Sequence, residues 1–231
     1  MKKKIICLIC ARGGSKGIKN KNIKFFFKKH LIEWTFKIAK SIKIFNNIYL
    51  SSDSKKIIKI AKKYKIDVPF IRPSKLARDK TKEIYVWKHM LKFLKKTKNY
   101  PDILVVLPPT APLRERKHVI YAINKFIKDK SDALITVKDP ENNPYFNMVQ
   151  VKKNNFVKII NDKKRFYRRQ DAPIVFSMST ICFVLKPDFI LKNKNIFDGK
   201  VSIAKFEKKY SLDIDDKFDF KIAELIKKNK V

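Results

Sequence analysis

The most chemically suggestive part of the chain is the loop at residues 12–22, RGGSKGIKNKN, which follows the short apolar run at residues 4–11. Glycine lets backbone N–H groups come close to a ligand and adopt positive φ. Such N–H groups, with fixed cations beside them, form a concave site for phosphate. This first loop therefore predicts binding of a phosphate-bearing small molecule, although a turn with solvated lysines would have a similar composition.

The first loop matches neither of the two common nucleotide fingerprints. A GxGxxG loop would need a glycine where Ser15 or Lys16 stands. A P-loop needs the sequence Gly-Lys-Ser/Thr, which the first loop does not contain. The residues thus indicate neither a dinucleotide-binding loop nor an ATPase loop.

A second candidate is the acidic segment at residues 212–220, LDIDDKFDF. Asp213 and Asp215, at positions i and i+2, would point to the same face of an extended chain. That spacing suits one hard divalent cation such as Mg²⁺, with phosphate oxygens as further ligands. Acids before a helix also cap its N-terminus, and we expect Asp216 and Asp219 to do so. For Asp213 and Asp215 the pattern alone leaves metal binding and capping open.

Two other segments carry side chains that suit hydroxylated or anionic ligands. Residues 108–114, PPTAPLR, predict a stiff loop in which Thr110 could hydrogen-bond a ligand, whereas Arg114 is better explained as a structural residue. Residues 168–173, RRQDAP, combine two arginines with an amide, a set that can clasp a carboxylate. A solvated basic patch is the alternative interpretation of the second segment.

Composition predicts a folded protein with a large core. The chain has 231 residues, of which 45% are hydrophobic, including 18 Phe, and we expect one domain over residues 1–231. The formal net charge of +35 invites a nucleic-acid function. However, lysines occur in every segment rather than in clusters, which favours a coding bias at surface positions. We therefore expect no specific nucleic-acid partner.

The three cysteines, Cys7, Cys10 and Cys182, predict no disulfide framework. Cys7 and Cys10 have the CxxC spacing, but residues three apart on a strand face opposite sides, so we expect buried thiols rather than a zinc or redox site. No stretch reaches the roughly 18 apolar residues of a membrane helix. These features predict a soluble, cytoplasmic protein without a membrane partner.

Strand-like and helix-like segments alternate up to residue 137. We expect strands at residues 4–11, 47–51, 68–71, 102–107 and 133–137, and helices at residues 31–44, 55–64, 82–96 and 115–128. This alternation predicts an α/β fold with a mostly parallel sheet and helices on both faces. Such sheets bind ligands beyond the carboxyl ends of their strands, where the loops at residues 12–22, 51–53 and 108–114 would lie.

The alternation breaks after Lys138. Residues 146–151 and 156–160 predict a hairpin, and residues 165–173 are basic and irregular. The earlier pattern then resumes, with strands expected at residues 180–185 and 201–206 and a helix at residues 216–228. We interpret residues 139–175 as an excursion from the main sheet, in the form of an arm.

Four motifs follow one another along the chain: ARGGSKG at residues 11–17 with Lys21-Asn22, PTAPLR at 109–114, RRQDAP at 168–173, and DID at 213–215. In this order they resemble the motifs of the acylneuraminate cytidylyltransferases, the CMP-sialic acid (CMP-nonulosonate) synthetases. The resemblance runs from the first strand to the last helix. The first motif, with its spacing to Lys21-Asn22, is specific.

The resemblance implies a three-layer, Rossmann-like nucleotidyltransferase fold and a homodimer, with residues 139–175 as the dimerisation arm. It also implies a reaction in which CTP and a nonulosonic acid of the N-acylneuraminate type give a CMP-sugar and pyrophosphate. In that reaction Mg²⁺ assists the attack of the anomeric hydroxyl on the α-phosphate. Surface polysaccharide biosynthesis is the process that such a product would serve.

Matching the motifs residue by residue implies the following roles. Nucleotide binding falls to Arg12, Gly13, Ser15, Lys16, Lys21 and Asn22; catalysis to Arg12, Lys21 and Asp215; Mg²⁺ binding to Asp213 and Asp215; and substrate binding to Thr110, Arg169 and Gln170. Asp213 or Asp215 is also the candidate general base. The resemblance implies that Arg169 reaches across the dimer to the sugar carboxylate in the neighbouring subunit.

The chain departs from the family pattern in two of these regions. Pro108 stands where the family usually has a glutamine associated with the sugar, and Ala111 replaces a serine, so the identity of the sugar stays open. Residues 80–83, KTKE, stand where relatives often carry small hydroxyl residues near the nucleotide. The rival functions are an octulosonate (KDO-type) cytidylyltransferase, a catalytically inactive homologue, and a basic nucleic-acid-binding protein without catalysis.

Overall fold

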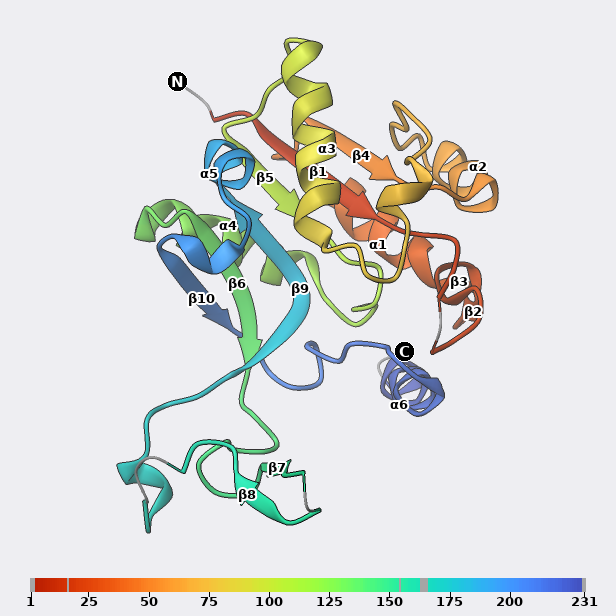
Figure 1. Ribbon diagram of the computed structural model, residues 1–231. Helices are drawn as coiled ribbons and strands as arrows, with labels where there is room; N and C mark the ends of the chain where they lie inside the picture. Colours follow the sequence, from red (N-terminus) through yellow and green to blue (C-terminus); the bar gives the residue numbers. More distant parts are fainter. Residues whose placement is uncertain (1–2, 16, 154, 163–165, 230–231) are drawn as a thin grey trace.

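The computed structural model describes residues 3–15, 17–153, 155–162 and 166–229. Its centre is a six-stranded sheet in the order β10-β6-β9-β5-β1-β4 (Figure 1). The strands are β1 (Ile5–Cys10), β4 (Asn47–Ser51), β5 (Ile103–Val106), β6 (Ala133–Lys138), β9 (Ser177–Leu185) and β10 (Val201–Lys205). Neighbouring strands are parallel, except that β9 runs antiparallel to both β5 and β6. The expected α/β class with a mostly parallel sheet is confirmed.

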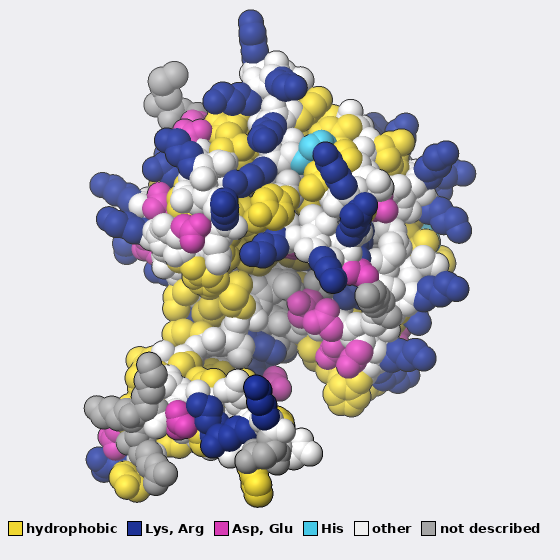
Figure 2. All heavy atoms as spheres, viewed as in Figure 1, with side chains coloured by type: hydrophobic (Ala, Val, Ile, Leu, Met, Phe, Trp, Pro, Cys, Tyr) yellow, Lys and Arg dark blue, Asp and Glu magenta, His cyan; other side chains and the backbone are white. Residues whose placement is uncertain are grey.

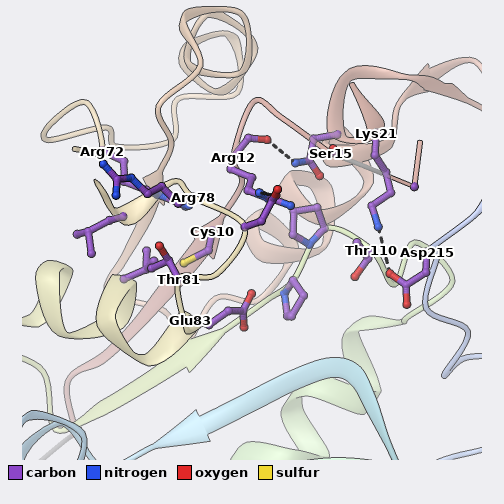
Figure 3. A pocket seen from close by; sticks show the side chains of 17 residues that line it. Cys10, Arg12, Ser15, Lys21, Arg72, Arg78, Thr81, Glu83, Thr110 and Asp215 are labelled. Carbon is purple, nitrogen blue, oxygen red and sulfur yellow. Dashed lines mark hydrogen bonds and ion pairs between the residues drawn. The ribbon is translucent and has the colours of Figure 1, made fainter. Parts of the chain in front are cut away.

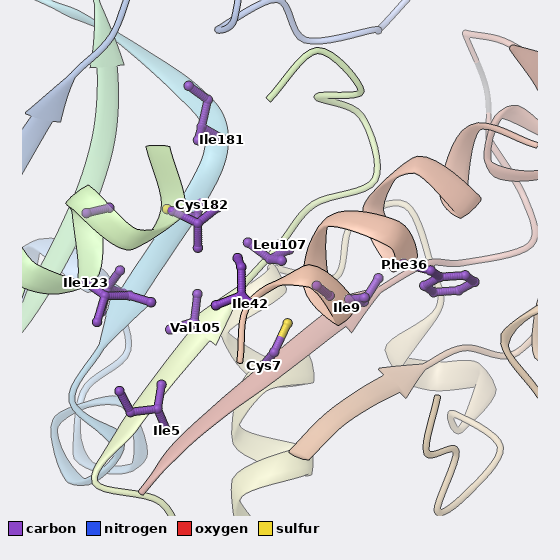
Figure 4. Close-up of a cluster of buried hydrophobic side chains, with 14 of the residues drawn as sticks. Ile5, Cys7, Ile9, Phe36, Ile42, Val105, Leu107, Ile123, Ile181 and Cys182 are labelled. Carbon is purple, nitrogen blue, oxygen red and sulfur yellow. The ribbon is translucent and has the colours of Figure 1, made fainter. Parts of the chain in front are cut away.

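Helices cover both faces of this sheet. They are α1 (Leu31–Ser41), α2 (Lys55–Lys63), α3 (Glu83–Lys96), α4 (Arg116–Asp129), α5 (Pro187–Lys192) and α6 (Lys217–Lys228), with short 3-10 helices η1 (Lys21–Ile23), η2 (Ser74–Leu76), η3 (Arg169–Asp171) and η4 (Ile196–Asp198). On one face, α1, α2 and α4 pack over Cys7 and Ile9 of β1 (Figure 4). On the other face, α3 and α5 pack over Ile6 and Leu8. No helix in the described parts of the chain is both long and apolar enough to span a membrane.

A smaller apolar cluster joins the last helix to the first loop. Phe220 of α6 packs edge-on against Phe26, with ring centroids 5.5 Å apart. Ile18 and Ile214 are buried in the same cluster. Phe26 belongs to a short hairpin, β2 (Phe25–Phe26) and β3 (Lys29–His30), which the sequence pattern did not predict. The cluster places the first loop and the β2–β3 hairpin beside the last helix.

The strand expected at residues 68–71 does not form, so that prediction was wrong. The segment makes only isolated bridges beside β4, at its two ends. Pro69 has no N–H to donate to a ladder, which prevents continuous pairing. The segment still follows the sheet, since the N–H of Arg72 donates to the backbone oxygen of Ser52 at 2.8 Å. It therefore delivers Arg72 to the carboxyl edge of β4.

The hairpin expected in the arm is present but shorter than predicted. Strands β7 (Val149–Val151) and β8 (Val157–Ile159) pair antiparallel, with Val149 opposite Ile159. Figure 1 shows that the arm stands apart from the main sheet. Its surface is rich in exposed apolar side chains: Val151 is 65% exposed and Ile174 is 85% exposed. Apolar surface of this kind is typical of an interaction site.

Arg114 holds the loop at residues 108–114 in place, which agrees with its expected structural role. Its guanidinium donates to the backbone oxygens of Ala111 at 3.0 Å, of Ile181 at 2.6 Å and of Pro108. It also donates to Thr35 Oγ1 of α1 at 3.2 Å. Burial lowers the pKa of Arg114 to about 10, so the side chain keeps its charge at neutral pH. One buried cation thus fixes this loop against β9 and α1.

Candidate functional site

A cavity of about 390 Å³ opens at the carboxyl ends of β1 and β5, where ligands bind in sheets of this kind (Figure 3). Its walls come from the first loop, from residues 72–86, from residues 108–110 and from the acidic segment. The predicted site residues that line it are Arg12, Ser15, Lys21, Asn22, Thr110 and Asp215. Segments that are far apart in the sequence therefore converge on one site.

Lys21 ties the first loop to the acidic segment. Its ammonium group donates to the backbone oxygen of Ile214 at 2.5 Å and to Asp215 Oδ1 at 3.3 Å. The Lys21 side chain is 14% exposed, whereas that of Asp215 is 79% exposed. A largely desolvated cation therefore stands beside a carboxylate that faces the cavity, an arrangement that can bind an anion and a metal ion next to each other.

The structure gives different outcomes for three of the predicted nucleotide-binding residues, Asn22, Gly13 and Lys16. Asn22 Nδ2 donates to the backbone oxygen of Arg12 at 3.1 Å, so the amide shapes the first loop as well as lining the cavity. Gly13 lies outside the cavity lining, and its N–H donates to Asp53 Oδ1 at 2.9 Å. Lys16 lies outside the described residues.

Gly17 permits the close approach of the first loop to the acidic segment. A Cβ atom at Gly17 would overlap the backbone oxygen of Asp215, whereas a Cβ atom at Gly14 would meet nothing within 4 Å. No glycine in the described residues has a positive φ, so the backbone freedom expected from the sequence is not used. What the site requires of Gly17 is its small size.

Cationic side chains face the cavity from more than one side. Arg12 forms an ion pair with Asp79, another lining residue. Arg72 is buried, and its Nε donates to Ser51 Oγ at 3.0 Å. Figure 3 shows Arg72 and Arg78 on the side of the cavity away from Lys21. Together these groups create a positive field that attracts a polyphosphate.

Asp213 is the less exposed member of the predicted metal pair: it is half-buried and lies outside the cavity lining, next to Asp215. Its Oδ1 has no hydrogen-bond partner among the described residues. Burial raises the pKa of Asp213 and nearby Asp215 raises it further, while the hydroxyls of Thr110 and Thr180 and the Lys21 ammonium oppose the rise. A divalent cation would supply the missing partner and relieve the repulsion between the two carboxylates. The donor set therefore fits one hard cation.

That cation would need oxygens from elsewhere to complete its coordination. No group of three or more His, Cys, Asp or Glu side chains suited to a metal occurs in the described part of the chain. Mg²⁺ in phosphoryl-transfer enzymes is typically held by one or two carboxylates, with water and substrate phosphates as the other ligands. The site has the donor set expected for a metal that arrives with a nucleotide.

Asp216 and Asp219 cap α6, as predicted. Asp216 Oδ1 accepts the N–H groups of Phe218 at 2.8 Å and of Asp219 at 2.9 Å. In return, Asp219 Oδ2 accepts the N–H groups of Asp215 at 3.0 Å and of Asp216 at 3.1 Å. The capping carboxylates are therefore these two, and the carboxylates of Asp213 and Asp215 remain available for a ligand.

The wall at residues 72–83 contains Arg72, Arg78, Asp79, Thr81 and Glu83. The resemblance to the family marked residues 80–83 as standing near the nucleotide, but it gave Arg72, Arg78 and Asp79 no role in the site. Glu83, the first residue of α3, has no hydrogen bond or ion pair among the described residues. Burial raises its pKa, and the charge of Arg72 opposes that rise. The position of this segment in the chain could have identified it as part of the site. It leaves the sheet at the same edge as the first loop and leads into α3.

Arg169 and Gln170 do not join the other predicted site residues. Both are exposed, lie in η3 within the arm, and are outside the cavity lining. Their neighbour Arg168 pairs with Asp171, with Nε 2.9 Å from Oδ2. In the single chain the cavity is thus built without the third sequence motif.

Comparison with known proteins agrees with this geometry. The family model for cytidylyltransferases matches residues 6–231. The chain is similar to post-translational flagellin modification protein B of Campylobacter coli, at 37% identity over 227 residues, covering 98% of this chain and 96% of that protein. It is also similar to the CMP-N,N'-diacetyllegionaminic acid synthase of Campylobacter jejuni, at 35% identity over 223 residues, covering 96% of this chain and 94% of that protein.

A solved structure shows the same fold. A CMP-2-keto-3-deoxy-manno-octonic acid synthetase complexed with CTP superimposes with a TM-score of 0.73, over 99% of this chain and 100% of that one. The sequence identity is 10%, so the likeness concerns the fold alone. The expected three-layer nucleotidyltransferase architecture is confirmed.

The packing of Gly17 leads to a testable prediction. Gly17→Ala should weaken CTP binding by at least about tenfold, because the added Cβ must push the first loop away from the Asp215 backbone. Isothermal titration calorimetry with CTP measures the effect. Gly14→Ala is the matched control, since its Cβ meets nothing within 4 Å and should leave the affinity unchanged. Equal affinities for the two variants would contradict the proposed role of the contact.

Proposed function

The chain belongs to the cytidylyltransferase family, and we propose that it transfers CMP from CTP to a nonulosonic acid, releasing pyrophosphate. The observation that carries this proposal is the convergence of Arg12, Lys21 and Asp215 on one cavity, with Asp213 near enough to Asp215 and Lys21 to feel their charges. Cations are needed to bind a triphosphate, and carboxylates are needed to hold a divalent ion. A protein that only bound phosphate would have no use for the acids.

In the proposed reaction the anomeric hydroxyl of the sugar attacks the α-phosphorus of CTP in line. The new O–P bond forms while the bond from the α-phosphorus to the α,β-bridging oxygen breaks, and pyrophosphate leaves. Arg12 and Lys21 stabilise the negative charge that builds up on the phosphates. Asp215 or Asp213 accepts the hydroxyl proton. The chain acts mainly by positioning the reactants and stabilising charge.

Asp213 and Asp215 would hold Mg²⁺ in this scheme. When bound, the ion neutralises charge on phosphate oxygens. Two observations support this assignment: Asp213 Oδ1 is buried without a partner among the described residues, and the nearby Asp215 charge raises the pKa of Asp213, a repulsion that a cation would relieve. The same carboxylates are not used in capping α6.

Whole-chain similarity guides the choice of sugar. The relative named for N,N'-diacetyllegionaminic acid makes that acid the first to test, and the relative named for flagellin modification points to a flagellar surface glycan as the destination of the product. The sequence identity to the octonic acid synthetase is only 10%, so that protein's substrate is not inferred for this chain. Pro108 and Pro109 line the cavity and offer the sugar apolar contact.

The positive charge does not require a nucleic-acid function. Figure 2 shows Lys and Arg side chains scattered over the visible face rather than gathered in one stripe. A diffuse positive field also raises the local concentration of CTP. The cavity and its paired carboxylates, which nucleic-acid binding would not explain, favour catalysis. A cytoplasmic location stays a prediction.

The proposed reaction can be tested by measuring pyrophosphate release from CTP and Mg²⁺ with a panel of nonulosonic acids. We expect release with CTP and N,N'-diacetyllegionaminic acid or a close relative of it, and none with ATP, GTP or UTP. A KDO-type octulosonic acid serves as the competing substrate. Pyrophosphate release with that acid alone would contradict the proposed substrate. No release from folded protein with any acid of the panel would contradict catalysis.

Asp215→Asn provides the internal control for this assay. Because the Asp215 side chain is 79% exposed, the melting temperature should stay close to that of the wild type. The turnover number should fall by at least about 100-fold, since the neutral amide is a weaker ligand for Mg²⁺ and a poorer proton acceptor than the carboxylate. Full activity of this variant at saturating Mg²⁺ would rule out the metal-binding role of Asp215.

We further propose that the arm at residues 139–175 forms a homodimer and brings Arg169 to the cavity of the other subunit. The exposed apolar side chains of the arm, Val151 and Ile174 among them, supply a surface for a second copy of the chain. Arg169 lies outside the cavity of its own subunit, so a role in binding the sugar carboxylate requires this crossing. An arginine can bind a carboxylate through two parallel hydrogen bonds.

Complementation between two inactive variants tests the crossing. Arg169→Met and Asp215→Asn should each abolish activity, but co-expression should restore about a quarter of wild-type activity, because each mixed dimer contains one intact site. Light scattering of the purified protein checks that dimers form. If Arg169 acted in its own subunit, every site would carry one defect and no activity would return.

A further inference from the structure

The turn after β4, at residues 52–54, lies against the first loop at the carboxyl edge of the sheet. Parallel sheets covered by helices bind ligands at that edge. The N–H of Ala11 donates to the backbone oxygen of Ser51 at 3.0 Å, so the pairing of β1 with β4 continues up to the start of the first loop. The first loop therefore begins directly beside this turn.

The peptide group between Arg12 and Gly13 is held from both sides. Its N–H, which belongs to Gly13, donates to Asp53 Oδ1 at 2.9 Å. Its carbonyl oxygen, which belongs to Arg12, accepts from Asn22 Nδ2 at 3.1 Å. Asp53 comes from the turn after β4 and Asn22 from η1, so two separate elements fix one peptide plane. Because each residue has only two soft backbone dihedrals, fixing this plane restricts the direction in which the Arg12 side chain leaves the backbone.

The turn that carries Asp53 is itself firmly held. The backbone oxygen of Ser52 accepts the N–H of Arg72 at 2.8 Å, and Ser52 Oγ accepts the N–H of Ser54 at 3.1 Å. The first loop packs tightly on this turn, since a Cβ atom at Gly13 would lie only 3.1 Å from Ser54 Cβ. The Asp53 carboxylate therefore acts from a fixed support rather than from a loose loop.

Arg12 links this anchored backbone to the cavity. Its side chain lines the cavity, and its guanidinium pairs with Asp79 on the wall at residues 72–83 (Figure 3). Asp53 and Gly13 lie outside the cavity lining. An effect of Asp53 on a ligand in the cavity would therefore pass through the first loop, and Arg12 is the side chain nearest to the anchored peptide.

We propose that Asp53 is a positioning residue that accepts the Gly13 N–H and thereby orients Arg12 toward the phosphates of CTP. This inference rests on the proposed function, because it needs Arg12 to bind those phosphates. A carboxylate makes a stronger hydrogen bond to a backbone N–H than a neutral acceptor does. Holding a binding group in the correct orientation avoids the entropic cost of ordering it when the ligand arrives.

A purely structural role for Asp53 gives a different expectation. Asp53 directly precedes Ser54, the N-cap of α2, and a carboxylate near a helix N-terminus stabilises the helix through its charge. If that were its only role, Asp53→Ala and Asp53→Asn would lower the melting temperature alike and leave the affinity for CTP unchanged. The positioning role predicts instead that Asp53→Ala weakens CTP binding and that Asp53→Asn, which keeps an acceptor oxygen, largely restores it.

The test is the dissociation constant of CTP, measured by isothermal titration calorimetry on the full-length protein with Mg²⁺. Asp53→Ala should raise this constant by about tenfold, with Asp53→Asn within about threefold of the wild type. Thermal melting verifies folding, and Asp53→Ser, whose side chain is too short to keep the bond, replaces the alanine variant if that variant does not fold. An unchanged affinity in Asp53→Ala, or an equal loss in Asp53→Ala and Asp53→Asn, would overturn the inference.

Arg12→Met separates failure of this inference from failure of the proposed site. If Asp53 acts through Arg12, the two effects are not additive, and Asp53→Ala should weaken CTP binding by less than about twofold in the Arg12→Met background. Additive effects would show that Asp53 acts by another route. If Arg12→Met loses affinity and Asp53→Ala does not, only the positioning role is wrong. If Arg12→Met binds CTP as tightly as the wild type, the phosphate-binding role of Arg12 is wrong and both proposals fall.

Discussion

The close contact between Gly17 and the backbone of Asp215 is the constraint on which the rest of the site depends. A residue with a Cβ atom at position 17 would hold the first loop and the acidic segment apart. Because the contact forms, the Lys21 ammonium reaches both the backbone oxygen of Ile214 and the carboxylate of Asp215. Two segments from opposite parts of the sequence, rather than one motif, therefore make the site.

Hydrogen bonds of buried groups fix the acidic segment, which is the partner of Gly17 in this contact. The N–H of Ile214 donates to the backbone oxygen of Thr110 at 2.9 Å, which ties the acidic segment to the loop after β5. Arg114, buried among backbone oxygens, fixes that same loop against β9. Each of these bonds crosses between elements, so the carboxylates are positioned by the fold rather than by their local sequence.

Much of the architecture could be predicted, because buried strands and capped helices leave local patterns. The alternation on β1 placed Cys7 and Cys10 on opposite faces, and Asp216 and Asp219 cap the last helix as expected, whereas metal binding by Asp213 and Asp215 stays a prediction. The strand expected at residues 68–71 was wrong, since one proline breaks the ladder there. Arg72 carried no signal, because its place in the cavity wall depends on how the segment before it runs beside β4, which is set by tertiary structure.

The central claim is that the first loop and the acidic segment form a single site for CTP and a divalent ion. A crystal structure with Mn²⁺ and a CTP analogue that resists cleavage tests it most directly. We predict an anomalous peak within coordination distance of both Asp213 and Asp215, with the triphosphate lying along the first loop beside Arg12 and Lys21. A triphosphate bound elsewhere, or Mn²⁺ held by phosphates alone and away from both carboxylates, would contradict the account.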